Sequence, residues 1–382
     1  MPQNSRLQNL HAAGQSVWLD YIDRTILVNG ALTRQIENDA LTGMTSNPTI
    51  FEKALATGTA YDAQLAAAPE ALTPLQLFEL IESDDVRTAC DQFRVVYEQS
   101  GGTDGYVSIE VSPNVAHDAD ATVEEAHRLW TLVNRPNVMI KVPGTEEGSK
   151  ALRRLIADGL NVNVTLLFAV EAYARIIEAY LTGLEERMKA GGDLHRVGSV
   201  ASFFISRVDN EVDARLDAII KDADSASRSR LGALKGKAAV ANAKLAYALF
   251  QRHFAGPRWE KLRAHSARVQ RPLWASTSVK NPAYRDVMYV EQLIGPDTVN
   301  TMPPATITAF QDHGDAARTV DSGVDEAREL LQALASEGIN MQQVTDKLLA
   351  EGLASFQKSF DTLLVGLETK LRSLGRAPVA TV

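Results

Sequence analysis

Short apolar runs alternate with long helical patterns along most of this chain, and that alternation limits the available folds more than any other feature. Runs of this kind, separated by helical sequence, are typical of a parallel sheet that helices cover. Eight strands close a (β/α)8 barrel, whereas an open doubly wound sheet usually begins with a glycine-rich turn, and the sequence has no Gly-x-Gly-x-x-Gly or Walker-type motif. We therefore predict an α/β fold, a (β/α)8 TIM barrel. The eight predicted strands are residues 16–22, 41–46, 105–112, 137–142, 161–167, 198–205, 272–278 and 298–302.

Three segments are longer than the minimal repeat and predict additional helices. Residues 51–102 leave room for two or three helices, and residues 208–270 are charged helical sequence rich in alanine, lysine and arginine. Residues 316–375 have an amphipathic pattern and predict a C-terminal helical extension. No linker rich in proline and serine divides the chain, and we find no internal repeat of about 20 to 50 residues. We expect residues 1–382 to form a single barrel domain with helical insertions.

Helix start and stop signals follow two of the predicted strands. Thr145 precedes an acidic first turn, and Gly159 offers a stop to the helix that this turn begins. After the fifth strand, apolar residues recur at helical spacing from Val170 until Gly191 and Gly192 end the pattern. Both predicted helices lie where a barrel needs its outer ring.

Charge and cysteine content restrict the partners and the compartment. The chain carries 39 Lys and Arg against 48 Asp and Glu, interspersed rather than in blocks, so no basic patch indicates nucleic acid or an anionic membrane. Cys90 is the single cysteine, which excludes an intramolecular disulfide and a thiolate metal cluster and fits a reducing compartment. The seven histidines show neither H-x-H nor H-E-x-x-H spacing, so we expect no metal. The N-terminus lacks the apolar core of a signal peptide, and no run of about 18 apolar residues occurs, so we expect a cytoplasmic protein.

Polar side chains share one face on three of the predicted strands, because residues two apart in an extended strand lie on the same side. These faces carry Ser108 and Glu110 on the third strand, Lys141 beside the apolar Met139 on the fourth, and Asn161, Asn163 and Thr165 on the fifth. The opposite faces, which covering helices would contact, are Val107, Ile109 and Val111; Val138, Ile140 and Val142; and Val162, Val164 and Leu166. The barrel would thus enclose a lysine, a carboxylate, amides and a hydroxyl. Burying such groups is costly unless they pair or react.

The lysine at the end of the fourth predicted strand points to carbonyl chemistry. An amine among apolar neighbours is desolvated and loses its proton more readily, and a neutral lysine attacks a carbonyl to form a Schiff base, an electron sink for breaking or making a carbon–carbon bond. Lys141 occupies this position, and Glu110 on the adjacent strand is the expected proton-transfer partner. Asp20, at the end of the first strand, is a second acid/base candidate. Candidates for hydrogen bonds to a polyhydroxylated substrate or an ordered water are Asn47, Asn163 and Thr165.

Hydroxyls and cations near the ends of the sixth and seventh strands suit a phosphate group. Barrels commonly bind phosphate near their last strands. The candidates are Ser202 with Arg207, and Ser276, Ser278 and Lys280. Ser276 and Ser278 are two residues apart, so an extended strand would put both on the same face.

Each of these side chains also has a structural interpretation. Lys141 could be a surface lysine at a strand end, and Glu110 could be its structural ion-pair partner, which is compatible with catalysis. Asp20 could belong to a salt-bridge cluster with Asp23 and Arg24. Further alternatives are a helix cap for Asn47, small barrel-filling side chains for Ser202, Ser276 and Ser278, and a helix-start ion pair of Arg207 with Asp209, Glu211 or Asp213.

Five segments, taken together and in order, resemble a known family. They are Gly-Met-Thr-Ser-Asn-Pro-Thr-Ile-Phe at residues 43–51, Val-Met-Ile-Lys-Val-Pro-Gly-Thr at 138–145, Asn-Val-Asn-Val-Thr-Leu-Leu-Phe at 161–168, Ser-Phe-Phe-Ile-Ser-Arg-Val-Asp at 202–209 and Trp-Ala-Ser-Thr-Ser-Val-Lys-Asn at 274–281. This set resembles the transaldolases, particularly their longer bacterial subfamily, to which the chain length is also similar. The resemblance covers all eight predicted strands.

The resemblance implies a barrel that moves a dihydroxyacetone unit between sugar phosphates without a cofactor or metal. Lys141 would form the Schiff base, Glu110 would shuttle protons through a water held with Thr165, and Asp20 would deprotonate the C4 hydroxyl. The implied substrate contacts are Asn47 to sugar hydroxyls, Asn163 and Ser202 to the C1 end, and Arg207, Ser278 and Lys280 to the phosphate. Lys280 stands where shorter family members often have arginine. It would therefore bind phosphate as a point charge, without the two parallel hydrogen bonds that a guanidinium can donate.

Three functions remain open at this point. The leading one is a transaldolase of the pentose phosphate pathway, with sedoheptulose 7-phosphate or fructose 6-phosphate as donor and glyceraldehyde 3-phosphate or erythrose 4-phosphate as acceptor. The second is an aldolase that releases free dihydroxyacetone, and the third is a non-catalytic phosphosugar-binding barrel, against which the lysine, glutamate and amide set argues. The expected partners are small-molecule sugar phosphates, without nucleic acid or membrane, for a monomer or homodimer.

Overall fold

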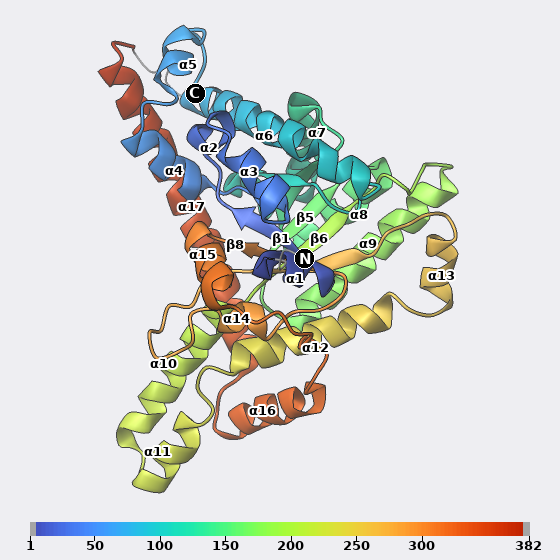
Figure 1. The fold of residues 1–382 in the computed structure, drawn as a ribbon, viewed down its shortest axis with the longest axis vertical. Coiled ribbons are helices and arrows are strands. Elements are labelled where there is room, and N and C mark those ends of the chain that lie inside the picture. The colour runs from blue at the N-terminus through green and yellow to red at the C-terminus, as the bar shows by residue number, and fades with distance from the viewer. Residues whose placement is uncertain (1–4, 377–382) are drawn as a thin grey trace.

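The computed structural model describes residues 5–376 and contains a closed barrel of eight parallel strands in chain order, with the first strand paired to the eighth (Figure 1). The (β/α)8 prediction is confirmed, and each predicted strand has an observed counterpart. The strands are β1 Gln15–Asp20, β2 Leu41–Thr45, β3 Val107–Glu110, β4 Val138–Pro143, β5 Val162–Leu167, β6 Ser199–Phe204, β7 Gln270–Ala275 and β8 Thr298–Met302. Residues 1–4 and 377–382 of the predicted domain lie outside the described part of the chain.

Helices surround the barrel and occupy the three long segments. They are α1 Arg6–Ala12, α2 Arg24–Val28, α3 Ala31–Asn38, α4 Pro48–Thr57, α5 Asp62–Ala67, α6 Pro74–Gln99, the 3-10 helix η1 Pro113–Val115, α7 Ala119–Val133, α8 Glu146–Asp158, α9 Val170–Lys189, α10 Ser206–Asp222, α11 Ser225–Gly232, α12 Ala238–His253, α13 Pro257–Arg263, α14 Met288–Glu291, α15 Pro304–His313, α16 Val324–Ser336 and α17 Met341–Ser373. Among residues 5–376, no helix combines the length and the apolar character needed to cross a membrane.

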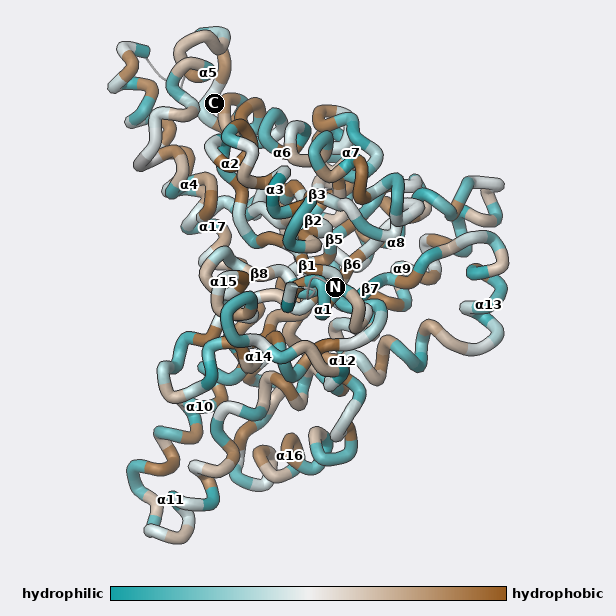
Figure 2. Tube along the Cα trace, in the orientation of Figure 1, coloured by the Kyte–Doolittle hydropathy of each residue, from teal (hydrophilic) through white to brown (hydrophobic). Residues whose placement is uncertain are grey.

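The predicted helix signals function as expected. The Thr145 hydroxyl accepts a hydrogen bond from the Gly148 N–H at the start of α8, and Gly159 ends that helix in the left-handed conformation, with φ +93°. Figure 2 shows hydrophilic and hydrophobic residues alternating along the outer helices, as expected where one side of a helix contacts the barrel. In α8 the buried side includes Leu152 and Leu155.

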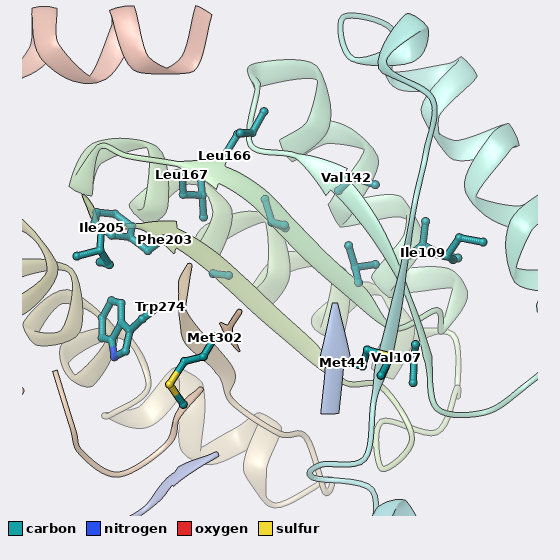
Figure 3. Close-up of a cluster of buried hydrophobic side chains, with 14 of the residues drawn as sticks. Met44, Val107, Ile109, Val142, Leu166, Leu167, Phe203, Ile205, Trp274 and Met302 are labelled. Carbon is teal, nitrogen blue, oxygen red and sulfur yellow. The ribbon is translucent and has the colours of Figure 1, made fainter. Parts of the chain in front are cut away.

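The register of strands β3, β4 and β5 places their polar side chains at the same level along the barrel axis. Glu110 on β3 pairs in register with Lys141 on β4, and Lys141 pairs with Asn163 on β5. Apart from Leu166, the predicted outward-facing apolar residues form a buried layer beneath the helices, where Figure 3 shows Val107 and Ile109. Each parallel neighbour is the next strand in the chain, so three consecutive strands bring their polar residues together.

Apolar side chains close the lower half of the barrel interior. Trp18, Met139 and Leu273 belong to a separate buried cluster there. The Trp18 indole donates a hydrogen bond to Asp104 Oδ1 at 2.8 Å, just before β3. In the described part of the chain, a cavity lies instead at the carboxyl ends of the strands.

Two strand predictions are wrong in detail. Leu166 was expected on the helix-facing side, but its φ of +60° interrupts the alternation, the register shifts between Val164 and Leu167, and the Leu166 side chain lies on a cavity wall. The seventh strand ends at Ala275 because Ser276 takes a φ of +56°, so the expected extended continuation through residue 278 does not form. Both departures occur at the carboxyl end of the barrel, where the chain leaves the sheet.

Candidate active site

A cavity of about 970 Å³ opens at the carboxyl ends of the strands. Nine of the predicted site residues line it, and so does Ser276. The nine are Asp20, Asn47, Glu110, Lys141, Thr165, Ser202, Arg207, Ser278 and Lys280. The structure therefore brings together residues that are spread over most of the chain.

Asn163 is the predicted residue that lies behind the wall rather than on it. Its side chain is fully buried, its Nδ2 donates to Ser108 Oγ at 3.0 Å, and its Oδ1 accepts from Ser202 Oγ at 2.7 Å. The amide orients the Ser202 hydroxyl, which does line the cavity. Direct contact of Asn163 with a ligand stays a prediction.

The amine and the carboxylate of the predicted catalytic pair are in contact. Lys141 is 8% exposed, and its Nζ donates to Glu110 Oε2 at 3.1 Å and to the Ser46 carbonyl at 3.2 Å. Burial raises the pKa of Glu110, while the positive charge of Lys141 and their hydrogen bond oppose that increase. A pKa raised above that of an ordinary glutamate is compatible with a role for Glu110 as a general acid/base.

Asp20 is held within the cavity rather than in a surface salt bridge. The Thr45 hydroxyl donates to Asp20 Oδ1 at 3.0 Å, and Arg24 pairs instead with Asp85 at 2.5 Å. Burial raises the pKa of Asp20, and the Lys141 charge partly offsets this effect. The salt-bridge alternative with Arg24 is therefore not what the structure shows.

The two predicted phosphate-binding cations, Arg207 and Lys280, are among the residues that line the cavity. The Arg207 guanidinium lies over the Phe204 ring, with its Cζ 5.1 Å from the ring centroid. Burial lowers the pKa of Arg207, and the charge of Asp20 counters this. The expected alternative, an ion pair with Glu211, is not formed, because Glu211 pairs with Arg215 at 2.8 Å and with Lys347 at 2.5 Å. The Lys280 side chain is exposed.

The start of the loop after β7 is tied to the start of α10. Ser276 Oγ lies 2.9 Å from Ser206 Oγ, and the Ser206 N–H donates to the Ser276 carbonyl at 3.0 Å. Ser276 and Ser278 both line the cavity, so the choice between them as the phosphate-contacting hydroxyl stays open.

Asn47 caps a helix and also lies on the cavity wall, while its contact with sugar hydroxyls stays a prediction. Its Oδ1 accepts from the Ile50 N–H at 3.1 Å and caps α4, and the residue also lines the cavity. The cap holds Asn47 at the point where the chain leaves β2.

Sequence reasoning missed several residues of the site. Thr301, at the end of β8, lies with its Oγ1 2.8 Å from Thr45 Oγ1, and its polar side chain near a strand end was a usable signal. The Ser46 contribution is a backbone carbonyl, which no side-chain pattern reveals. Gly352 and Phe356 come from α17, which runs beside α4 in Figure 1. No local pattern indicates that a helix so far along the chain reaches the cavity.

The comparisons with known proteins agree with this geometry. Residues 17–367 match the model of the transaldolase/fructose-6-phosphate aldolase family. The chain belongs to this family. A relative from a Nostoc species named "Transaldolase 2" is 48% identical over 375 residues, which cover 97% of this chain and 98% of the relative. "Transaldolase" from Mycolicibacterium smegmatis is 47% identical over 97% of this chain and 99% of its own, and "Transaldolase" from Thermobifida fusca is 48% identical over 94% and 96%. The chain is an enzyme of the transaldolase family.

Proposed function

We propose that this chain transfers a dihydroxyacetone unit from a ketose phosphate to an aldose phosphate through a Schiff base on Lys141. The observation that carries the proposal is the contact of the buried Lys141 amine with Glu110 at 3.1 Å inside the cavity. A non-catalytic sugar-binding barrel would have no need to bury an amine beside a carboxylate. Relatives named transaldolase over nearly the whole chain support the same reaction.

The covalent steps balance without an external reagent. The Lys141 amine adds to the ketose C2 carbonyl, and the carbinolamine loses water to give an imine. Removal of the C4 hydroxyl proton breaks the C3–C4 bond and releases an aldose phosphate. The electron pair of the broken bond remains on the lysine-bound fragment as an enamine. The enamine carbon then attacks the acceptor aldehyde, whose oxygen takes up the proton. Water hydrolyses the new imine, and the amine is restored.

Two carboxyls supply the proton transfers. Glu110, adjacent to the amine, is suited to the carbinolamine step, with a water held between it and Thr165. Asp20 is suited to accept the C4 hydroxyl proton and to return it to the acceptor oxygen. Asn47 would hold sugar hydroxyls, and Ser202, oriented by Asn163, would hold the C1 end.

The cations that line the cavity support phosphorylated substrates. Arg207, Ser278 and Lys280 would bind the phosphate shared by donors and acceptors. The proposed donors are sedoheptulose 7-phosphate and fructose 6-phosphate, and the proposed acceptors are glyceraldehyde 3-phosphate and erythrose 4-phosphate, as in the pentose phosphate pathway. A cytoplasmic monomer or homodimer, binding neither nucleic acid nor membrane, completes the proposal.

Transfer and simple cleavage are separated by the role of the acceptor. Fructose 6-phosphate supplied with erythrose 4-phosphate should yield sedoheptulose 7-phosphate and glyceraldehyde 3-phosphate in equal amounts. Omission of erythrose 4-phosphate should stop sustained turnover. Steady release of free dihydroxyacetone at a rate independent of the acceptor would favour the aldolase alternative instead.

A further inference from the structure

The cations proposed to bind phosphate lie on two segments that are far apart in the sequence. Arg207 is in the first turn of α10, and Lys280 is in the loop of residues 276–287 that follows β7. Within the described residues, the Lys280 ammonium forms no hydrogen bond or ion pair, so the position of its loop limits the region that the flexible side chain can reach. If Arg207 and Lys280 bind the same phosphate, the loop must keep a fixed position relative to α10.

Two carboxylates on α10 hold that loop. Asp209 and Asp213 are four residues apart and so lie on one face of the helix. The Tyr289 hydroxyl donates to Asp209 Oδ2 at 2.8 Å, and the Tyr284 hydroxyl donates to Asp213 Oδ2 at 2.6 Å. Tyr284 is in the loop, and Tyr289 lies in α14 directly after it.

The remaining oxygens of both carboxylates bind the start of α12 and the turn before it. Asp209 Oδ1 accepts from the Ala239 N–H at 2.8 Å, and Asp213 Oδ1 accepts from the Gly236 N–H at 3.0 Å. Asp209 thus links Tyr289 to the first turn of α12, and Asp213 links Tyr284 to the turn before α12.

Close packing and a turn fix Tyr284 next to Lys280. A Cβ at Gly236 would lie 2.6 Å from Tyr284 Cζ, and Gly236 has a φ of +68°, so this position accommodates the ring only as glycine. The Tyr284 N–H donates to the Asn281 carbonyl at 3.0 Å, which closes a turn. Asn281 directly follows Lys280, so a shift of Tyr284 displaces the lysine.

The two carboxylates are costly to bury. Asp209 is fully buried and Asp213 is 8% exposed, yet neither pairs with a cation among residues 5–376. Burial raises the pKa of Asp209 to about 6, and hydrogen bonds from Ala239 and Tyr289 limit that increase. Unpaired buried carboxylates destabilise a fold, so their placement at this loop indicates a positioning role.

We propose that the Asp213–Tyr284 hydrogen bond, supported by Asp209–Tyr289, sets the distance between Arg207 and Lys280 and thereby the affinity for the phosphate of the sugar substrates. Tyr284 and Asp213 are positioning residues, because they act through the loop and do not line the cavity. This inference rests on the proposed phosphate-binding function of the cavity.

Replacement of one hydroxyl tests the inference. Tyr284→Phe should raise KM for fructose 6-phosphate and the Ki of inorganic phosphate by about tenfold each, with kcat changed by less than about twofold, as expected for loss of one hydrogen bond to a charged group. Borohydride trapping of unphosphorylated dihydroxyacetone on the enzyme should be unchanged. Asp213→Ala should reproduce these effects, and Asp213→Asn, which keeps both hydrogen-bonding positions, should restore KM to near the wild-type value.

Tyr180→Phe is the matched control. Its hydroxyl donates to the Arg268 carbonyl at 2.8 Å, just before the opposite end of β7, so the same chemical change there should leave KM unaltered. An unchanged KM in Tyr284→Phe would overturn the inference, as would an equal loss of dihydroxyacetone trapping. If the wild type trapped no ketose, the proposed function would fail, whereas calorimetric binding of inorganic phosphate would still decide whether Tyr284 positions the cations.

Discussion

The Nζ of Lys141 lies 3.1 Å from Oε2 of Glu110, on the neighbouring strand and in register with it. The pair sits above a packed apolar interior and below an open cavity, with the Ser46 carbonyl as the second acceptor for the amine. Such an arrangement keeps the proposed nucleophile and its proposed proton-transfer partner in contact before any substrate arrives, which would favour imine formation.

Glu110→Gln should slow turnover by about 10²- to 10³-fold, because the amide cannot exchange a proton during carbinolamine dehydration. Single-turnover borohydride trapping would measure the imine-forming step directly. Glu125→Gln is the control, since Glu125 accepts from the Ser112 N–H at 2.8 Å in the same region but does not line the cavity. A Glu110→Gln enzyme that traps substrate at the wild-type rate would remove Glu110 from this step.

Asp20→Asn should form the imine but fail to break the C3–C4 bond, so that turnover falls by about 10³-fold while borohydride adducts persist. In the wild type, Asp20 must be ionised to accept the proton, and burial raises its pKa above the ordinary 3.8. The loss of kcat on acidification should therefore occur at a higher pH than for a free aspartate. Loss of adduct and turnover together in Asp20→Asn would assign it to imine formation instead.

Arg207→Lys should raise KM for fructose 6-phosphate by about tenfold and leave dihydroxyacetone trapping unchanged. The reason is that an ammonium cannot donate the two parallel hydrogen bonds with which a guanidinium binds a phosphate. Arg215→Lys on the same helix is the matched control, since Arg215 pairs with Glu211 away from the cavity. Equal KM changes in the two variants would show that α10, rather than phosphate binding, is perturbed.

Glu82, on α6, is a fully buried carboxyl that the proposed reaction does not use. Burial raises its pKa well above the ordinary 4.5, and the charge of Glu110 adds to the effect. The native state therefore keeps a proton that the unfolded state releases, so the wild type loses stability as pH rises from about 4.5 toward the folded pKa. Glu82→Gln should raise Tm by on the order of 2 °C at pH 8 and by less at pH 5.

Glu79→Gln provides the contrast for that experiment. Glu79 receives two hydrogen bonds from Arg128, at 2.6 and 2.8 Å, so its replacement should not increase Tm at any pH. Thermal unfolding across pH 5 to 8 measures both variants, and a Glu82→Gln advantage that shrinks with rising pH would contradict the assignment of Glu82 as a buried neutral acid.

The strands and the central pair could be predicted because their signals are local. Period-two alternation assigns Glu110 and Lys141 to one face, and adjacent parallel strands bring them to one height. The end of a strand is less predictable, since the positive φ of Leu166 and of Ser276 depends on packing that the alternation does not contain. Thr301 meets Thr45 only when the barrel closes between β8 and β1.

Contacts made by the additional helices were the least predictable part of the site. Phe356 of α17 lines the cavity. The amphipathic pattern of that helix predicts that one of its faces is buried, but it does not identify the surface that the face contacts. The Asp213–Tyr284 contact joins two segments about 70 residues apart, and each residue by itself has the composition of an ordinary charged helix or loop.

Reduction of the enzyme with borohydride in the presence of fructose 6-phosphate, followed by peptide mass mapping, tests the central proposal most directly. We expect one reduced adduct, carried by the peptide that contains Lys141. Lys141→Met should form no adduct while remaining folded. Absence of an adduct in the wild type, or an adduct on a different lysine such as Lys280, would contradict Lys141 as the Schiff-base residue.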